Sequence, residues 1–137
     1  MKILACTDFS AAAAAGEREA ARRFPDATLV IFHATNLRML RRIVEQTGLD
    51  GARLYESMTS YADQRMNEVV NRLISQGRKA IAELGEGDPV DLALAAASRH
   101  HADLVVMGAP AGEPVGRFRT LLVRKSRLPV LLIPTEE

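Results

Sequence analysis

Cysteine is nearly absent from this sequence of 137 residues, in which Cys6 stands alone. A single thiol excludes an intrachain disulfide framework and any zinc site with more than one thiolate ligand. An excess of charge of one sign is also lacking, because 18 Lys and Arg balance 17 Asp and Glu to a net charge of +1. That balance argues against a protein that binds nucleic acid or a membrane through charge.

Long hydrophobic runs are absent as well. No apolar segment approaches the roughly 18 residues that a membrane-spanning helix needs. The first residues reach the carboxylate of Asp8 before the apolar region of a signal peptide could form. We therefore expect a cytoplasmic protein, and the length predicts a single domain over residues 1–137.

Several catalytic and cofactor-binding motifs are missing. Neither GxxxxGK[ST] nor GxGxxG occurs, which argues against a standard P-loop or dinucleotide fingerprint. The sequence has no CxxC, which excludes thioredoxin-like redox chemistry, and no serine stands on a recognisable nucleophile elbow. We identify no catalytic residue and no metal ligand, and we expect a protein that acts by binding rather than by turnover.

Five short apolar runs are present, at residues 3–6, 29–34, 80–84, 104–107 and 130–133. Several are nearly continuous and rich in β-branched side chains, a pattern typical of strands buried on both faces of a parallel sheet. Helical patterns separate them, at residues 11–24, 54–74, 89–101 and 117–126. A further short helix is indicated within residues 35–51 by Leu37, Leu40 and Val44. This alternation predicts an α/β fold with a mostly parallel sheet.

One segment between the fourth strand and the last helix is unusual. Residues 108–116 contain Gly108, Gly112 and Gly116 just before a helix begins. Backbone N–H groups of a glycine-rich loop at a helix N-terminus can cradle phosphate. Arg117 and Arg119 open that helix and add two guanidinium groups that bind phosphate well.

The chain resembles the universal stress protein family over nearly its whole length, except for residues 35–52. Five segments carry the resemblance, in the family's order and spacing: KILACTDFS (2–10), VIFHA (30–34), GEGDP (85–89), ADLVVMG (102–108) and KSRLPVLLI (125–133). The resemblance implies a doubly wound, Rossmann-like sheet of five parallel strands in the order 3-2-1-4-5, with helices on both faces. It also implies nucleotide contacts at Asp8, Ala34, Met107 and Gly108.

The glycine-rich segment departs from the pattern of family members that bind ATP. Only seven residues separate Gly108 from Gly116, against twelve in the ATP-binding pattern. Gly112 stands one place late, and Arg117 takes the position of a hydroxyl residue. Pro110 and Pro114 lack N–H groups, and Glu113 adds negative charge.

These departures favour a homodimeric binding or adaptor module of stress adaptation, with weak or no binding of ATP. One alternative is a sensor that binds ATP or AMP through residues 108–116, and another is a weak nucleotide hydrolase. We expect a nucleotide or a small anion as the ligand, and no partnership with nucleic acid or membrane. The strand order would leave the last strand at a sheet edge, so we expect dimerisation through it, at four apolar residues: Val130, Leu131, Leu132 and Ile133.

Overall fold

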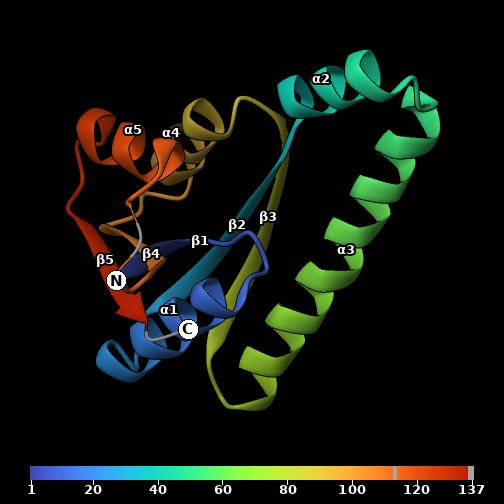
Figure 1. Cartoon of the computed structure of the whole chain (residues 1–137). Coiled ribbons are helices and arrows are strands. Elements are labelled where there is room, and N and C mark those ends of the chain that lie inside the picture. The colour runs from blue at the N-terminus through green and yellow to red at the C-terminus, as the bar shows by residue number, and fades with distance from the viewer. Residues whose placement is uncertain (113, 136–137) are drawn as a thin grey trace.

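The computed structural model describes residues 1–112 and 114–135 of the chain. Five parallel strands form one sheet in the order β3-β2-β1-β4-β5 (Figure 1). The strands are β1 (Lys2–Cys6), β2 (Thr28–Asn36), β3 (Lys79–Gly87), β4 (Leu104–Pro110) and β5 (Val130–Thr135). This order confirms the predicted doubly wound fold, and it places the topological switch point between β1 and β4.

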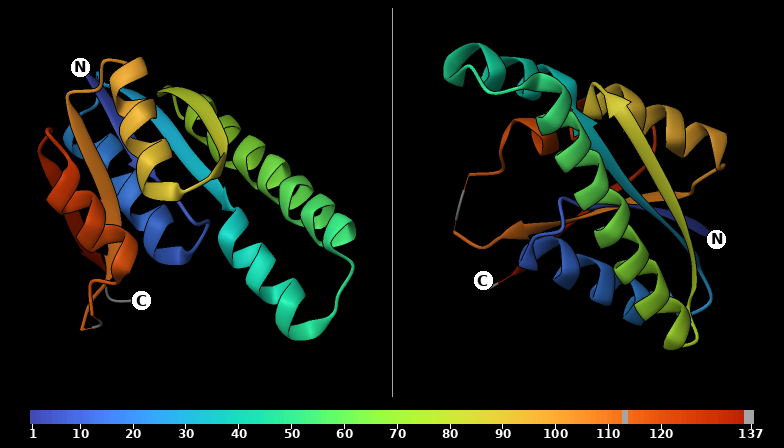
Figure 2. Two further views of the ribbon diagram at one scale, coloured as in Figure 1. Left: turned by 90° about the horizontal axis from the view of Figure 1, so that it is seen from above. Right: turned by 90° about the vertical axis from the view of Figure 1, so that its right-hand side faces the viewer.

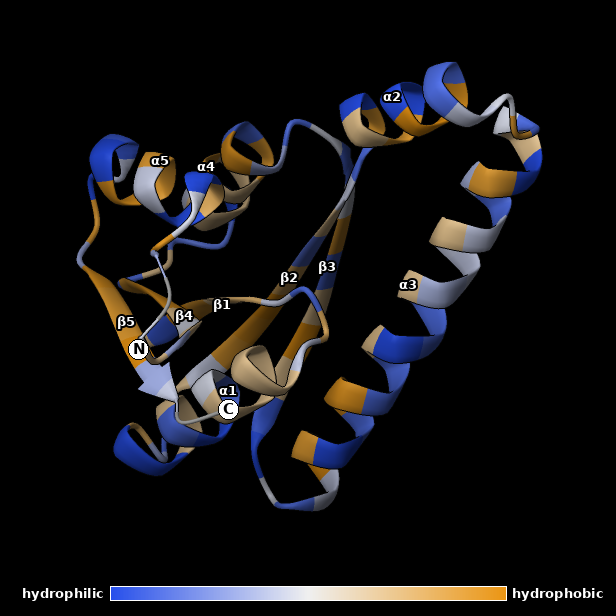
Figure 3. Cartoon of the chain, in the orientation of Figure 1, coloured by the Kyte–Doolittle hydropathy of each residue, from blue (hydrophilic) through white to orange (hydrophobic). Residues whose placement is uncertain are grey.

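Helices cover both faces of the sheet (Figures 1 and 2). They are α1 (Ala11–Arg23), α2 (Leu37–Thr47), α3 (Gly51–Ser75), α4 (Pro89–Arg99) and α5 (Arg117–Lys125). Apolar residues predominate along the central strands, as the hydropathy colours show (Figure 3). In β1, Ile3 and Ala5 pack with α1 and α3, whereas Leu4 and Cys6 pack with α4 and α5. Two hydrophobic layers therefore enclose the central strands.

Capping side chains explain where the helices begin. The Ser10 hydroxyl accepts a hydrogen bond from the N–H of Ala13, as predicted for the start of α1. Helix α3 begins three residues earlier than predicted, because Asp50 Oδ1 accepts the N–H groups of Ala52 and Arg53 at 3.0 and 3.3 Å. A carboxylate cap satisfies donors that the first turn leaves free, so the helix extends back to meet it.

Burial on both faces, predicted for several of the strands, does not extend to β3. This strand lies at one edge of the sheet, and its residues are exposed or half-exposed along its whole length. Ile81 and Leu84 remain 42% and 39% exposed. The helices cover this edge of the sheet only in part, so an apolar run in the sequence does not by itself indicate that a strand is buried.

The short helix predicted after the second strand is present as α2, and it projects from the body of the molecule together with the start of α3 (Figures 1 and 2). No residue of α2 is buried. Its apolar side chains meet the start of α3, where a Cβ on Gly51 would lie 3.5 Å from Val44 Cγ2. Of the helices in the described residues, none combines the length and the apolar character needed to cross a membrane.

Candidate functional site

A cavity of about 230 Å³ opens at the carboxyl ends of β1, β2 and β4, on the side of the sheet that α4 and α5 cover. This is the switch point at which open α/β sheets bind their ligands. Twelve residues line the cavity: Cys6, Thr7, Asp8, Ala13, Phe32, His33, Ala34, Pro89, Met107, Gly108, Phe118 and Arg119. Most of this wall is apolar, so its few polar groups decide what it can hold.

Asp8 supplies the carboxylate of the cavity. Its Oδ1 accepts the N–H of Ser10 at 3.0 Å, which closes a tight turn between β1 and α1. Partial burial raises the pKa of Asp8, but hydrogen bonds from Ser10 and the positive charge of Arg119 outweigh this, and the pKa lies below its ordinary value. The side chain is therefore a charged acceptor at neutral pH.

His33 is held by the backbone and by an aromatic neighbour. Its Nδ1 lies 2.8 Å from the carbonyl oxygen of Thr7, so Nδ1 carries the hydrogen and donates it. The rings of His33 and Phe9 lie with their centroids 4.5 Å apart. Phe9 adopts a φ of +64°, a conformation that is costly for a bulky residue. This turn places the Phe9 ring over His33 and leaves Asp8 at the mouth of the cavity.

Arg119 supplies the guanidinium of the cavity. Its Nε donates to the carbonyl oxygen of Gly108 at 2.9 Å, and its Nη1 donates to that of Val115 at 3.3 Å. Two backbone carbonyls thus anchor the planar group and leave further N–H donors for a ligand. The charge that α5 brings to the cavity is fixed in position.

Close packing against α1 requires glycine at position 108, which the glycine-rich pattern did not reveal. A Cβ at this position would lie 1.9 Å from the carbonyl oxygen of Ala12, in helix α1. Gly16 stands opposite, where a Cβ would come within 2.8 Å of the Gly108 nitrogen. The two glycines let α1 approach β4 closely, and so bring the start of α1 to the wall of the cavity.

The model of the universal stress protein family matches residues 1–134, which is nearly the whole chain. The chain belongs to the universal stress protein family. Among curated proteins, no sequence matches it significantly. The resemblance inferred from the five sequence segments is therefore confirmed at the level of the family.

Solved structures agree with this universal stress protein fold. The hypothetical protein MJ0577 superposes with a TM-score of 0.80 at 20% identity, over 99% of this chain and 96% of that one. A family member from Burkholderia pseudomallei gives a TM-score of 0.70 at 23% identity, over 98% and 96% of the two chains. A family protein from Arabidopsis thaliana with AMP bound gives 0.71 at 15% identity, over 99% and 92%. These identities establish a shared fold.

The site residues expected from the sequence fall into two groups in this universal stress protein. Asp8, Ala34, Met107 and Gly108 lie in the cavity wall, and so does Arg119. Gly112, Gly116 and Arg117 do not line it, and all three are exposed. Glu113 lies outside the described residues.

Three apolar residues of the wall were not among the site residues expected from the sequence. Phe32, Pro89 and Phe118 supply apolar surface, and the available signal was position alone: Phe32 lies in the middle of β2, and the other two lie at the starts of α4 and α5. In residues 1–112 and 114–135, no three His, Cys, Asp or Glu side chains gather as they would around a metal ion. One carboxylate and one guanidinium in an apolar wall suit the binding of a polar organic anion.

Proposed function

We propose that this universal stress protein acts by binding, and that its cavity takes an adenine nucleoside monophosphate. Two structural neighbours support this class of ligand, since one is a complex with AMP and another a complex with cAMP. The observation that carries the proposal is that the anchored guanidinium of Arg119 and the carboxylate of Asp8 line the same cavity. It offers one site for an anionic group and one for hydroxyl or amino groups.

The proposed roles follow from the chemistry of the wall. The apolar side chains of Phe32, Met107 and Phe118 suit the faces of a planar base. Asp8 accepts hydrogen bonds from ribose hydroxyls or from the adenine amino group, because its lowered pKa keeps it ionised. Arg119 binds a single phosphate through the N–H groups that its backbone contacts leave free.

ATP is proposed to bind weakly, because the cavity offers few hydrogen-bond donors for the second and third phosphates. Between Gly108 and Gly116, Pro110 and Pro114 contribute no N–H group. Gly116 precedes the first residue of α5 and offers no capping side chain. Arg117, the first residue of the helix, is exposed and stands outside the cavity wall. A triphosphate would therefore place its outer charges largely in solvent.

We also propose that the protein is a homodimer joined through β5, serving as an adaptor in stress adaptation. Strand β5 pairs with β4 on one side and occupies a sheet edge on the other. Val130, Leu131 and Leu132 are only partly buried, whereas Ile133 is 8% exposed. Pro134 lies inside β5 rather than beyond it, which suits an edge strand and limits further pairing to residues before it.

Isothermal titration calorimetry with AMP tests the nucleotide proposal, with two arginine variants as a matched pair. Arg119→Ala removes the anchored cation. We expect it to lower the affinity for AMP about tenfold or more, which corresponds to the loss of a charge-assisted hydrogen bond. Arg117→Ala removes an equal charge two residues away, outside the cavity wall, and is expected to stay within about twofold. Equal losses from the two variants would refute the role of Arg119.

A further inference from the structure

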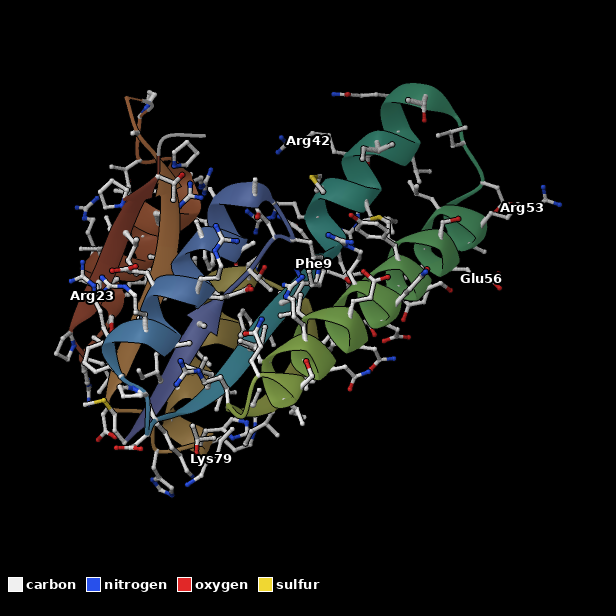
Figure 4. The ribbon with its side chains drawn as sticks, turned by 90° about the horizontal axis from the view of Figure 1, so that it is seen from below. Phe9, Arg23, Arg42, Arg53, Glu56 and Lys79 are labelled. Carbon is white, nitrogen blue, oxygen red and sulfur yellow. The ribbon has the colours of Figure 1, made fainter. Side chains whose placement is uncertain are left out.

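A second cavity, of about 280 Å³, lies on the opposite side of the sheet, between α1 and α3. Figure 4 looks at this side of the molecule, with Phe9 between the two helices. Nine residues line the cavity: Thr7, Phe9, Ser10, Ala11, Ala14, Glu17, Arg65, Val69 and Arg72. Ala11 and Arg72 are exposed, so the cavity opens to solvent. Thr7 lines both cavities, which therefore flank the end of β1.

A buried carboxylate without a full set of partners lies in this wall. Glu17 is 4% exposed, and its Oε1 has no hydrogen-bond partner among the described residues. Burial raises the pKa of Glu17, against the opposing effects of the Thr7 hydroxyl and of the positive charge of Arg72. A buried oxygen left unpaired is costly, and such groups commonly mark the place of a bound partner.

Positive charge faces Glu17 from the other helix. Arg65 and Arg72 are seven residues apart in α3, so they lie on one face of that helix. Arg65 pairs through Nη1 with Glu68 at 2.8 Å, while its Nε is buried and has no partner in the described part of the chain. The N-terminus of α1 also lines the cavity, and its first turn contains no acidic residue. Two nearby carboxylates oppose an anion: that of Asp8, and that of Glu68, which is paired with Arg65.

We propose that this cavity is a second ligand site, which takes a small hydroxylated anion. A hydroxyl group of the ligand pairs with Glu17 Oε1, and its phosphate or carboxylate binds Arg65 and Arg72. A hydroxyl suits Glu17 in either protonation state, because it can both donate and accept. The volume is about nine times the roughly 30 Å³ that a water molecule occupies in the liquid, enough for a polyol phosphate or a hydroxy acid.

Titrations of the full chain, followed by amide resonances in nuclear magnetic resonance spectra, test the proposal with matched probes. Glycerol 3-phosphate is compared with propyl phosphate, and glycerate with propionate, so that each pair differs only in hydroxyl groups. Comparison of the phosphate pair with the carboxylate pair shows which of the two anionic groups the site prefers. The hydroxylated member of at least one pair is expected to shift the amides of Ser10, Ala11 and Val69, and to bind about tenfold or more tightly than its partner.

Three variants assign the groups responsible. Glu17→Leu is expected to abolish the preference for the hydroxylated probe, and Arg72→Ala is expected to weaken both members of the pair. Arg53→Ala is the control, because Arg53 lies in the same helix at its distant, exposed end (Figure 4). Nuclear Overhauser contacts between the carbon-bound hydrogens of the bound probe and the Glu17 methylenes provide a further test that needs no substitution.

Several results would overturn the proposal. They are no shift at the three amides, equal affinity within both pairs, a preference that survives Glu17→Leu, or the absence of Overhauser contacts to Glu17. Shifts confined to Ala34 and Gly108 would place the probe in the first cavity, and would equally refute a second site. AMP binding at the first cavity is measured separately, so either proposal can fail while the other stands.

Discussion

Arg119 in α5 donates a hydrogen bond from its Nε to the carbonyl oxygen of Gly108 in β4, with the two atoms 2.9 Å apart. This contact joins the two sides of the segment that connects the strand to the helix. It fixes a cation at the switch point of the sheet, where its charge helps to keep the pKa of Asp8 low. Backbone groups therefore position both charges of the cavity, because the Gly108 carbonyl holds Arg119 and the Ser10 N–H holds Asp8.

The close approach of α1 to β4 predicts a large effect of Gly108→Ala. The added methyl group would lie 1.9 Å from the Ala12 carbonyl oxygen, so the helix must move. We expect the free energy of unfolding in urea to fall by at least about 2 kcal/mol. Gly51→Ala is the control, because its nearest contact is an ordinary 3.5 Å and it lies in the first turn of α3. A similar small change from both variants would contradict the packing argument.

The backbone conformation of Gly116 predicts a loss of stability from strain rather than from a steric clash. Its φ of +84° and ψ of 160° belong to a region that almost only glycine adopts. Among the residues that the structure describes, only Arg119 comes within 4 Å of the position of a Cβ here, through Nη1 at 3.7 Å. Gly116→Ala should therefore lower stability by about 1–3 kcal/mol through backbone strain alone. Gly48→Asn, at a left-handed cap that asparagine tolerates, should cost much less. An unchanged denaturation midpoint for Gly116→Ala would show that this conformation is not maintained in solution.

Glu17 predicts a pH-dependent stability. Burial raises its pKa in the folded state above the ordinary 4.5, so the folded protein holds this proton more tightly than the unfolded chain. Its stabilising contribution is complete below about pH 4.5 and is lost as the pH rises through the folded-state pKa. The stability of Glu17→Gln relative to the unmodified protein should therefore increase from pH 4 to pH 7 in urea unfolding.

Glu56→Gln is the control for that comparison, because Glu56 is exposed on α3 (Figure 4). The pH dependence of its stability is the background that removal of one surface carboxyl produces, and it is subtracted from that of Glu17→Gln. No remaining pH dependence for Glu17→Gln would mean that the Glu17 carboxyl is equally solvated in the folded and unfolded states.

The two sheet edges predict opposite responses to the same substitution. Strand β3 carries Lys79, Glu83 and Glu86, whereas residues 130–133 of β5 carry no charge. Charged side chains discourage pairing at an edge, so dimerisation is expected at β5. Light scattering should give about twice 15.0 kDa for the unmodified protein and for Ile81→Lys in β3, and a shift toward monomer for Leu132→Lys. A dimer lost with Ile81→Lys but kept with Leu132→Lys would place the interface at the wrong edge.

Much of the fold could be predicted from local patterns and the family resemblance. The apolar runs and the helical patterns between them gave the strands and helices in their correct order, because each element satisfies its own backbone hydrogen bonds and buries its own apolar face. Burial of β3 could not be predicted, since it depends on how far α3 and α4 reach over the edge. The start of α3 was placed late, because the pattern began at an apolar residue and not at the Asp50 cap.

The site was predicted in part for a related reason. Asp8 lies two residues beyond the end of β1, and Ala34 lies two residues before the end of β2, so the order of the strands alone brings them close to one another. Arg117 and Arg119 have the same charge at the same helix start, and only the direction of each side chain decides which reaches the cavity. That direction is set by hydrogen bonds to Gly108 and Val115, which join positions that no short motif connects.

The affinity of AMP relative to ATP, measured by titration calorimetry on the unmodified protein at one salt concentration, tests the central claim most directly. The cavity offers one anchored guanidinium, and prolines interrupt the segment that would hold further phosphates. We therefore expect AMP to bind, and to bind at least as tightly as ATP. An ATP affinity tenfold above that of AMP would contradict the account, and so would the absence of binding by either nucleotide.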